Sequence, residues 1–151
     1  MKLIKQRPYE CYLAVVAMLA DVPVDLVRET AAQLAGTPVE WFEWFEDLDW
    51  LPVTERNAKG ERLCKAFGLP ALKASMAVGT VGNNDVGSLH GKGQIAFRAG
   101  LTAHTVAYEN GIIFDPDPEY PGGMTWQEHQ KWRLGLIREP IDEIEVIPVT
   151  L

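Results

Sequence analysis

The chain has little of the chemistry that would connect it to nucleic acid, a membrane or a disulfide framework. It carries 14 lysines and arginines against 21 acidic residues, a net charge of −7, and phosphate binding needs a basic face. It has only two cysteines, Cys11 and Cys64, so no disulfide framework can be inferred. Its sequence contains no apolar run of the ~18–20 residues that span a bilayer, and its opening stretch lacks the small-residue cleavage site of a signal peptide. We therefore expect a reduced, cytoplasmic protein with no nucleic-acid or membrane partner.

The pattern of the 151 residues predicts a single domain, residues 1–151, in which helices come first and antiparallel strands second, which is typical of an α+β fold. Residues 10–22 are apolar on every side, as in a buried helix. Proline near the start and glycine after the end mark a second helix, and Thr37 with Glu40 forms a capping box for a third. The predicted helices are 10–22, 22–36, 37–48, 55–67 and 124–132, and the predicted strands are 94–99, 104–109, 112–116 and 143–151.

The sharpest local signal is Asn110-Gly111, which lies between two strand-like runs and predicts a hairpin with a two-residue type I′ turn. The turn sets the register, so that Glu109 faces Ile112 and each following pair is fixed. His104 then shares a face with Asp115, as diagonal neighbours ~7–8 Å apart at the backbone. Asp117 would lie directly opposite His104 in the same register, but Pro116 and Pro118 would break the ladder there. We favour Asp115 as the histidine's partner, with Asp117 as the alternative.

Cys11 lies in the first turn of the predicted buried helix, where unpaired N–H groups and the helix dipole favour a thiolate. An imidazolium nearby would lower the pKa of the thiol further, as in nucleophilic catalysis by a Cys–His pair. Gln6, five residues earlier, could join the Cys11 backbone N–H in donating to an oxyanion. Cys64 lies inside an amphipathic helix and reads as a small buried hydrophobe. The candidate catalytic residues are thus Gln6, Cys11, His104 and Asp115.

These strings resemble the papain-like cysteine peptidases, and within them the peptidase C39-like family. Q-RPYE-C-YLAVVAML is similar to the family's opening motif, and HTVAYENGIIFDP to its second motif. The resemblance implies a papain-like fold, Cys11 as nucleophile, His104 as base and acid, Asp115 as orienting residue and Gln6 in the oxyanion hole. The chain departs from the family at Tyr12, where glycine is usual and where the larger ring could crowd the substrate cleft. The spacing from Gln6 to Cys11 is also one residue short of the usual pattern.

Other residues offer weaker signals. His90, in the glycine-rich segment 77–93, is expected to be a solvated loop histidine, and the segment itself could overhang the site. His129 lacks a second histidine four residues on, so we do not expect a metal there, and no cofactor motif is present. The tryptophans of 37–48 are expected in the core, although an exposed Trp41 or Trp44 could line an interface.

The sequence therefore predicts a thiol hydrolase, most simply a cysteine peptidase acting on a peptide or protein substrate. An acyltransferase or amidase of transglutaminase-like type shares the Cys, His, Asp order. A binding or inhibitory module that has lost catalysis is a further alternative, and the negative charge would suit a basic protein partner. The oligomeric state does not follow from the sequence.

Overall fold

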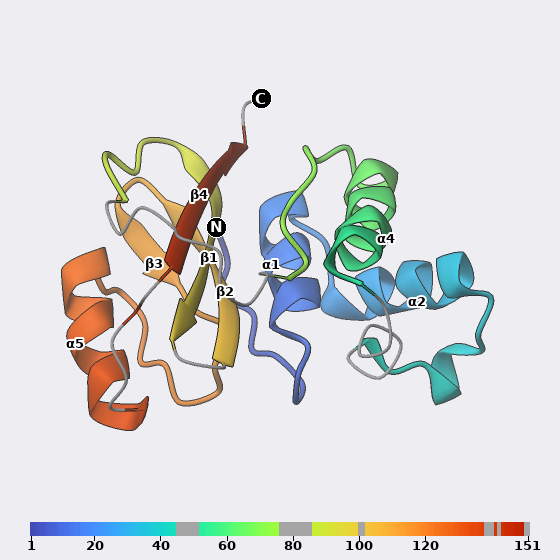
Figure 1. Ribbon diagram of the computed structural model, residues 1–151, viewed down its shortest axis with the longest axis horizontal. Helices are drawn as coiled ribbons and strands as arrows, with labels where there is room; N and C mark the ends of the chain where they lie inside the picture. The colour runs from blue at the N-terminus through green and yellow to red at the C-terminus, as the bar shows by residue number, and fades with distance from the viewer. Residues whose placement is uncertain (45–51, 76–85, 100–101, 138–140, 142, 150–151) are drawn as a thin grey trace.

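The computed structural model describes residues 1–44, 52–75, 86–99, 102–137, 141 and 143–149. The first part of the chain is helical and the second forms a sheet with one further helix (Figure 1). The elements are α1 (Cys11–Ala20), α2 (Val24–Ala35), η1 (Val39–Trp41), α4 (Val53–Ala66), β1 (Lys92–Ala99), β2 (Thr102–Glu109), β3 (Ile112–Phe114), α5 (Trp126–Ile137) and β4 (Glu143–Val149).

The four strands form one antiparallel sheet in the order β3-β2-β1-β4. This confirms the prediction of an α+β fold with an antiparallel sheet. Each strand alternates its side chains between two faces. On β1, Ile95 and Phe97 point to one face, while Gln94 and Ala96 point to the other. Both faces of the sheet are covered, which explains why strand residues on either side are buried.

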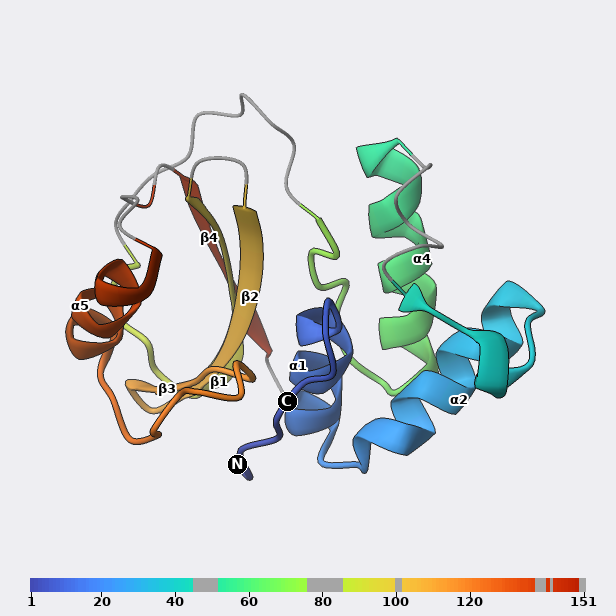
Figure 2. The same ribbon diagram turned by 90° about the horizontal axis from the view of Figure 1, so that it is seen from below.

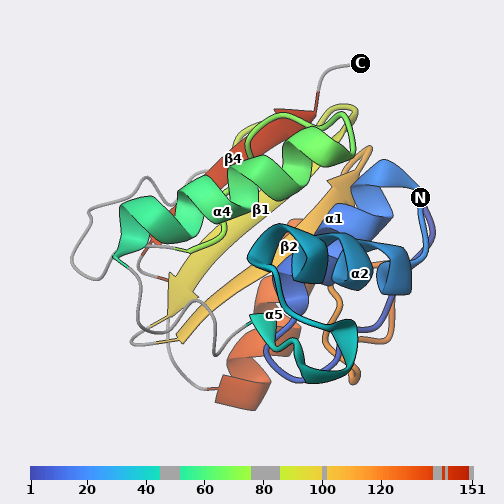
Figure 3. The ribbon, with the colours of Figure 1, turned by 90° about the vertical axis from the view of Figure 1, so that its right-hand side faces the viewer.

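Helices lie on both sides of the sheet (Figure 2). Helix α1 lies between the sheet and the pair α2 and α4, whereas α5 covers the opposite face. Viewed from the helical side, α4 and α2 lie in front of the strands (Figure 3). The core accordingly has two parts. One surrounds α1, and the other lies between the sheet and α5 around Phe97 and Trp126.

Helix α1 is buried on all sides, as its uniformly apolar sequence predicts. Residues 12–19 are each 3% exposed or less. Burial of one large apolar side chain stabilises a fold by about 1.5–3 kcal/mol, so this helix is a main source of stability. Its central position also means that its first residue, Cys11, is held by both the helical and the sheet layer.

The predicted helix at 37–48 is interrupted where the structure describes it. Only the short η1 forms before the backbone becomes extended at Phe42, and Trp44 is helical again. The predicted cap is also missing, because no side chain caps the start of η1. Packing explains the change: Phe42 and Trp44 are both buried, and the Phe42 carbonyl accepts a hydrogen bond from Arg28 Nη2 at 2.9 Å. Residues 45–48 lie outside the described residues.

The other predicted helices are present with shifted bounds. Helix α4 starts two residues earlier than predicted and ends as predicted, before Gly68 in the left-handed region at φ 70°. Helix α5 extends beyond the predicted 124–132 to Ile137. Its start is capped reciprocally, since Thr125 N–H donates to Glu128 Oε1 at 3.2 Å and Glu128 N–H donates to Thr125 Oγ1 at 3.3 Å. Among the described helices, none is long and apolar enough to cross a membrane.

Candidate active site

The β2–β3 hairpin has the predicted turn and register. Asn110 and Gly111 both have positive φ, 49° and 83°, as a type I′ turn requires. Glu109 pairs with Ile112, and the ladder runs on to Ala107 and Phe114. Strand β3 ends there, so the earlier part of β2 has no β3 partner beside it. His104 lies on this part of β2, next to the point where Asp115 leaves the sheet.

His104 and Asp115 form the predicted hydrogen bond, with Nε2 of the histidine 2.7 Å from Oδ1 of the carboxylate. The Asp115 side chain is fully buried and that of His104 is 9% exposed. Asp117 does not take this place. Its backbone N–H donates to Asp115 Oδ1 at 2.9 Å, and its own Oδ1 accepts from the Glu119 N–H. Of the two candidates, the structure brings Asp115 to the histidine.

Cys11 is the first residue of α1 and is half-buried at the edge of β2. Cys11, His104 and Thr105 line the same small pocket, and the His104 ring and the Thr105 backbone are the hydrogen-bonding groups that lower the pKa of the thiol. Because His104 Nε2 is engaged by Asp115, Nδ1 is the ring nitrogen left for the thiol. A backbone N–H is the only main-chain donor available to stabilise a thiolate, so Thr105 contributes its N–H. The sequence pointed to the histidine but not to this second donor.

The three groups shift one another's ionisation. Burial by itself would raise the pKa of the Cys11 thiol, but the hydrogen bond and charge of His104 outweigh it, and the pKa lies below its ordinary value. Burial would likewise lower the pKa of His104, yet the charge and hydrogen bond of Asp115 raise it to about 9. The pKa of Asp115 is held far below its usual range, against burial, by His104 and His129. These shifts favour a thiolate–imidazolium pair at neutral pH.

Gln6 lies near the site through its backbone. Its N–H donates to the Pro116 carbonyl at 2.8 Å, which ties the segment before α1 to the residue after Asp115. Its side-chain nitrogen makes a long hydrogen bond of 3.4 Å to the Arg7 carbonyl, and Oε1 is buried without a hydrogen-bond partner. The proposed donation from this amide to an oxyanion stays a prediction.

A small pocket of about 50 Å³ opens at Cys11 and His104. Segment 73–75 forms one wall. Gln94 holds it by accepting from the Lys73 N–H and donating to the Lys73 carbonyl, both at 2.9 Å. Asn57 Oδ1 accepts from the next two backbone N–H groups. Besides the cysteine and histidine, the lining consists mostly of small side chains: Lys73, Ala74, Ser75, Ala96, Ala103 and Thr105. The pocket is therefore narrow next to the thiol.

Two residues of α5 reach Asp115 that the sequence did not connect with the site. His129 Nε2 lies 2.7 Å from Asp115 Oδ2, and Arg133 Nη1 lies 3.4 Å from the same oxygen. Both side chains are buried. The overlooked signal is that His129 and Arg133 are one turn apart and share the inner face of the helix with Trp126. Polar residues on the buried stripe of a helix need partners, and here the partner is the carboxylate.

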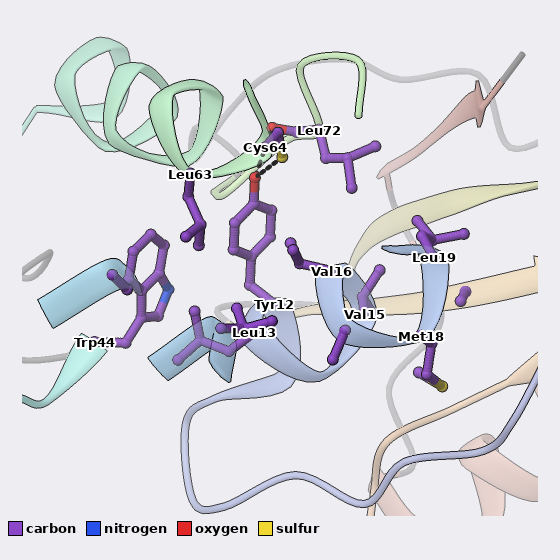
Figure 4. Close-up of a cluster of buried hydrophobic side chains, with 14 of the residues drawn as sticks. Tyr12, Leu13, Val15, Val16, Met18, Leu19, Trp44, Leu63, Cys64 and Leu72 are labelled. Atoms are coloured by element: carbon purple, nitrogen blue, oxygen red, sulfur yellow. Dashed lines mark hydrogen bonds between the residues drawn. The ribbon is translucent and has the colours of Figure 1, made fainter. Parts of the chain in front are cut away.

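Tyr12 does not crowd the cleft, which corrects the expectation from the sequence. Its ring is 2% exposed and stacks on Trp44 with ring centroids 5.4 Å apart. Its hydroxyl donates to the Leu72 carbonyl at 3.1 Å and lies 3.1 Å from Cys64 Sγ (Figure 4). Neighbouring residues of a helix lie about 100° apart around its axis, so Cys11 can line the pocket while Tyr12 belongs to the helical core.

The remaining candidates behave mostly as expected. Cys64 is fully buried, and burial raises the pKa of its thiol. His90 is exposed. Trp44 is in the core, whereas Trp41 is 80% exposed. Residues 76–85 of the glycine-rich segment lie outside the described residues. Within the described part of the chain, no group of three or more histidine, cysteine or acidic side chains could hold a metal ion.

No family model, curated protein or solved structure matches this chain. The chemistry of the site itself is therefore what indicates a function.

Proposed function

We propose that this protein is a cysteine peptidase-like thiol hydrolase with a papain-like fold. The observation that carries the proposal is the chain of contacts from Cys11, at the start of a buried helix, through the His104 ring to the buried carboxylate of Asp115. Each link has the chemistry that the reaction needs. The thiol has a lowered pKa, the histidine can hold and release a proton, and the carboxylate fixes the ring.

The reaction would proceed in two halves. The Cys11 thiolate attacks the carbonyl carbon of a peptide or amide bond, and the imidazolium of His104 protonates the leaving amine as the C–N bond breaks. Water then attacks the resulting thioester, with the neutral ring of His104 accepting its proton. The carboxylic acid is released as the C–S bond breaks, and the thiolate–imidazolium pair is restored. The Cys11 backbone N–H at the open start of α1 is available to stabilise the oxyanion, with Gln6 as the expected second donor.

The position of Tyr12 also supports an active site. Two features are reasons to consider a module that has lost catalysis: the Tyr12 ring, which could crowd the cleft, and the short spacing from Gln6 to Cys11. The place of Tyr12 in the helical core removes the first of them. The small side chains around the pocket leave the thiol accessible from one side. A peptide or protein substrate fits a site that opens at the surface between the sheet and segment 73–75.

Selective alkylation tests this proposal. We expect limiting iodoacetamide near neutral pH to label Cys11 at least ten times faster than Cys64, since only thiolates react and burial opposes ionisation of Cys64. His104→Ala should slow the labelling of Cys11 by about tenfold or more, while labelling of Cys64 stays unchanged. Peptide mapping by mass spectrometry measures both rates in the same sample.

The matched test of catalysis uses a mixture of peptides with wild-type protein, Cys11→Ala and Cys64→Ala. Cleavage products should appear with wild type and with Cys64→Ala and be absent with Cys11→Ala. A product joined to an added amine would point to acyl transfer instead. Equal labelling of both cysteines, or cleavage that survives Cys11→Ala, would refute the thiol mechanism.

A further inference from the structure

The carboxylate of Asp115 has more partners than a histidine–aspartate pair requires. Oδ1 accepts from His104 at 2.7 Å and from the Asp117 N–H at 2.9 Å. Oδ2 accepts from His129 at 2.7 Å and from Arg133 at 3.4 Å. The group that orients His104 is thus itself held from the far side of the sheet, by a helix that contributes nothing else to the pocket at Cys11.

The direction of the hydrogen bond between His129 and Asp115 follows from the chemistry of the two groups. The ionised carboxylate can only accept, so His129 Nε2 must carry the proton. Its Nδ1 is buried and has no hydrogen-bond partner, which favours the tautomer protonated on Nε2 alone. A ring in that state donates to Asp115 without adding a charge that would compete with the His104 imidazolium.

The surroundings of His129 leave its ring little freedom. It is fully buried and stacks on Trp126, with ring centroids 5.4 Å apart and an angle of 23° between the planes. Three more aromatic rings enclose it, all with centroids within 6.1 Å: Phe97, Tyr120 and Trp132. Such packing fixes the orientation of a side chain more firmly than one hydrogen bond does.

The same packing connects His129 to the histidine of the site. Phe97 contacts both histidine rings edge to face, with centroids 6.1 Å apart for His129 and 5.5 Å apart for His104. Arg133 lies over the same phenyl ring at 5.1 Å. A shift of α5 would therefore be felt at His104 through both the carboxylate and Phe97.

We infer that His129 is a positioning residue of the active site, which holds Asp115 so that Asp115 can hold His104 against Cys11. The inference rests on the proposed function. The functional unit is then a chain of four residues: Cys11, His104, Asp115 and His129. Arg133, at 3.4 Å from Asp115, is a weaker second donor to the carboxylate. The other charged and titratable groups that face this unit are Arg133 from α5, and Asp117 and Tyr120 from the loop after β3.

The test compares two substitutions that differ in whether the new side chain can donate a hydrogen bond to Asp115. His129→Leu introduces an apolar side chain of similar size, which cannot donate. His129→Gln places an amide nitrogen at about the same reach and can still donate to Asp115. His90→Leu is the matched control, because it removes an exposed histidine distant in sequence from the site. The readouts are the pH profile of Cys11 alkylation by iodoacetamide and the NMR titration of the His104 ring.

We expect His129→Leu to narrow the pH range in which the Cys11 thiolate and the His104 imidazolium coexist. Without the donor the Asp115 carboxylate is no longer held in place against His104, and its hydrogen bond to the ring weakens. The acidic midpoint of alkylation should therefore rise and the pKa of His104 should fall, each by about one pH unit. Peptide cleavage should drop about tenfold. His129→Gln should restore both midpoints to within a few tenths of a unit, and His90→Leu should leave them unchanged.

Each outcome decides the inference. Unchanged midpoints in a folded His129→Leu protein would overturn it, as would an equal shift in His129→Gln. If His129→Leu does not fold, the pH profile of alkylation in His129→Gln and the NMR spectrum of the wild-type protein are the deciding measurements. A wild-type His129 ring protonated on Nδ1 rather than Nε2 would then overturn the inference. The proposed function fails separately, when wild-type Cys11 reacts no faster than Cys64.

Discussion

At the scale of single residues, the site shows how neighbouring positions on α1 serve different purposes. Cys11 lines the pocket beside His104, whereas Tyr12 turns into the helical core, where its hydroxyl lies 3.1 Å from Cys64 Sγ. The hydroxyl of Tyr12 also satisfies the buried Leu72 carbonyl, next to the segment 73–75 that forms a wall of the pocket. An unsatisfied buried carbonyl costs about 1–3 kcal/mol, so Tyr12 has a structural purpose that glycine could not fulfil.

Tyr12→Phe tests this assignment. We expect the free energy of unfolding to fall by about 1–2 kcal/mol, because the Leu72 carbonyl loses its partner while the ring packing is kept. The rate of Cys11 alkylation in the folded protein should stay within about twofold of wild type. Urea unfolding and labelling measure the two effects. A large loss of reactivity with unchanged stability would place the ring in the cleft after all.

The site could be predicted from the sequence where its contacts are local. The Asn110-Gly111 turn sets a register over a few residues, and that register places His104 beside Asp115 without reference to the rest of the fold. The contribution of His129 depends on how α5 docks against the sheet, which no short pattern encodes. The side to which Tyr12 points depends on the packing of Trp44 and Leu72, which are distant in sequence.

At the scale of elements, the β2–β3 hairpin and the capped start of α5 position the side chains that contact Asp115. The hairpin forms because both of its turn residues, Asn110 and Gly111, adopt positive φ. In α5, Thr125 and Glu128 fix where the helix begins, and hence which face carries His129. The predicted helix at 37–48 failed for the opposite reason. Its capping signal was local, but the burial of Phe42 favours an extended backbone at that residue, and the helical conformation returns only at Trp44.

Gly111→Ala tests the hairpin. A Cβ at this position would meet no atom within 4 Å, so the cost is that of the left-handed backbone alone, about 1–2 kcal/mol in the free energy of unfolding. Gly135→Ala in α5 is the matched control, since its added Cβ also meets nothing within 4 Å. It should be neutral or stabilise the protein by about 0.5–1 kcal/mol. Equal effects of the two substitutions in urea unfolding would contradict the type I′ turn.

At the scale of the whole molecule, the proposed active site lies where the two layers of the protein meet. Cys11 comes from the helical layer, while His104 and Asp115 come from the sheet. Glu10 and Arg28 fix the start of α1 to α2 through a buried ion pair of 2.9 Å. The Gln6 N–H fixes the preceding segment to Pro116 on the other side. The lowered pKa of the thiol is thus a property of the assembled fold, which local sequence patterns could indicate only as a possibility.

The most direct test of this account is a pH titration of thiolate absorbance in wild type, with Cys11→Ala subtracted as the baseline. The account predicts that Cys11 ionises at a pH below the ordinary thiol value of 9.0, and that His104→Ala moves the midpoint upward. A Cys11 midpoint at or above the ordinary value, or one that His104→Ala leaves in place, would contradict the thiolate–imidazolium pair.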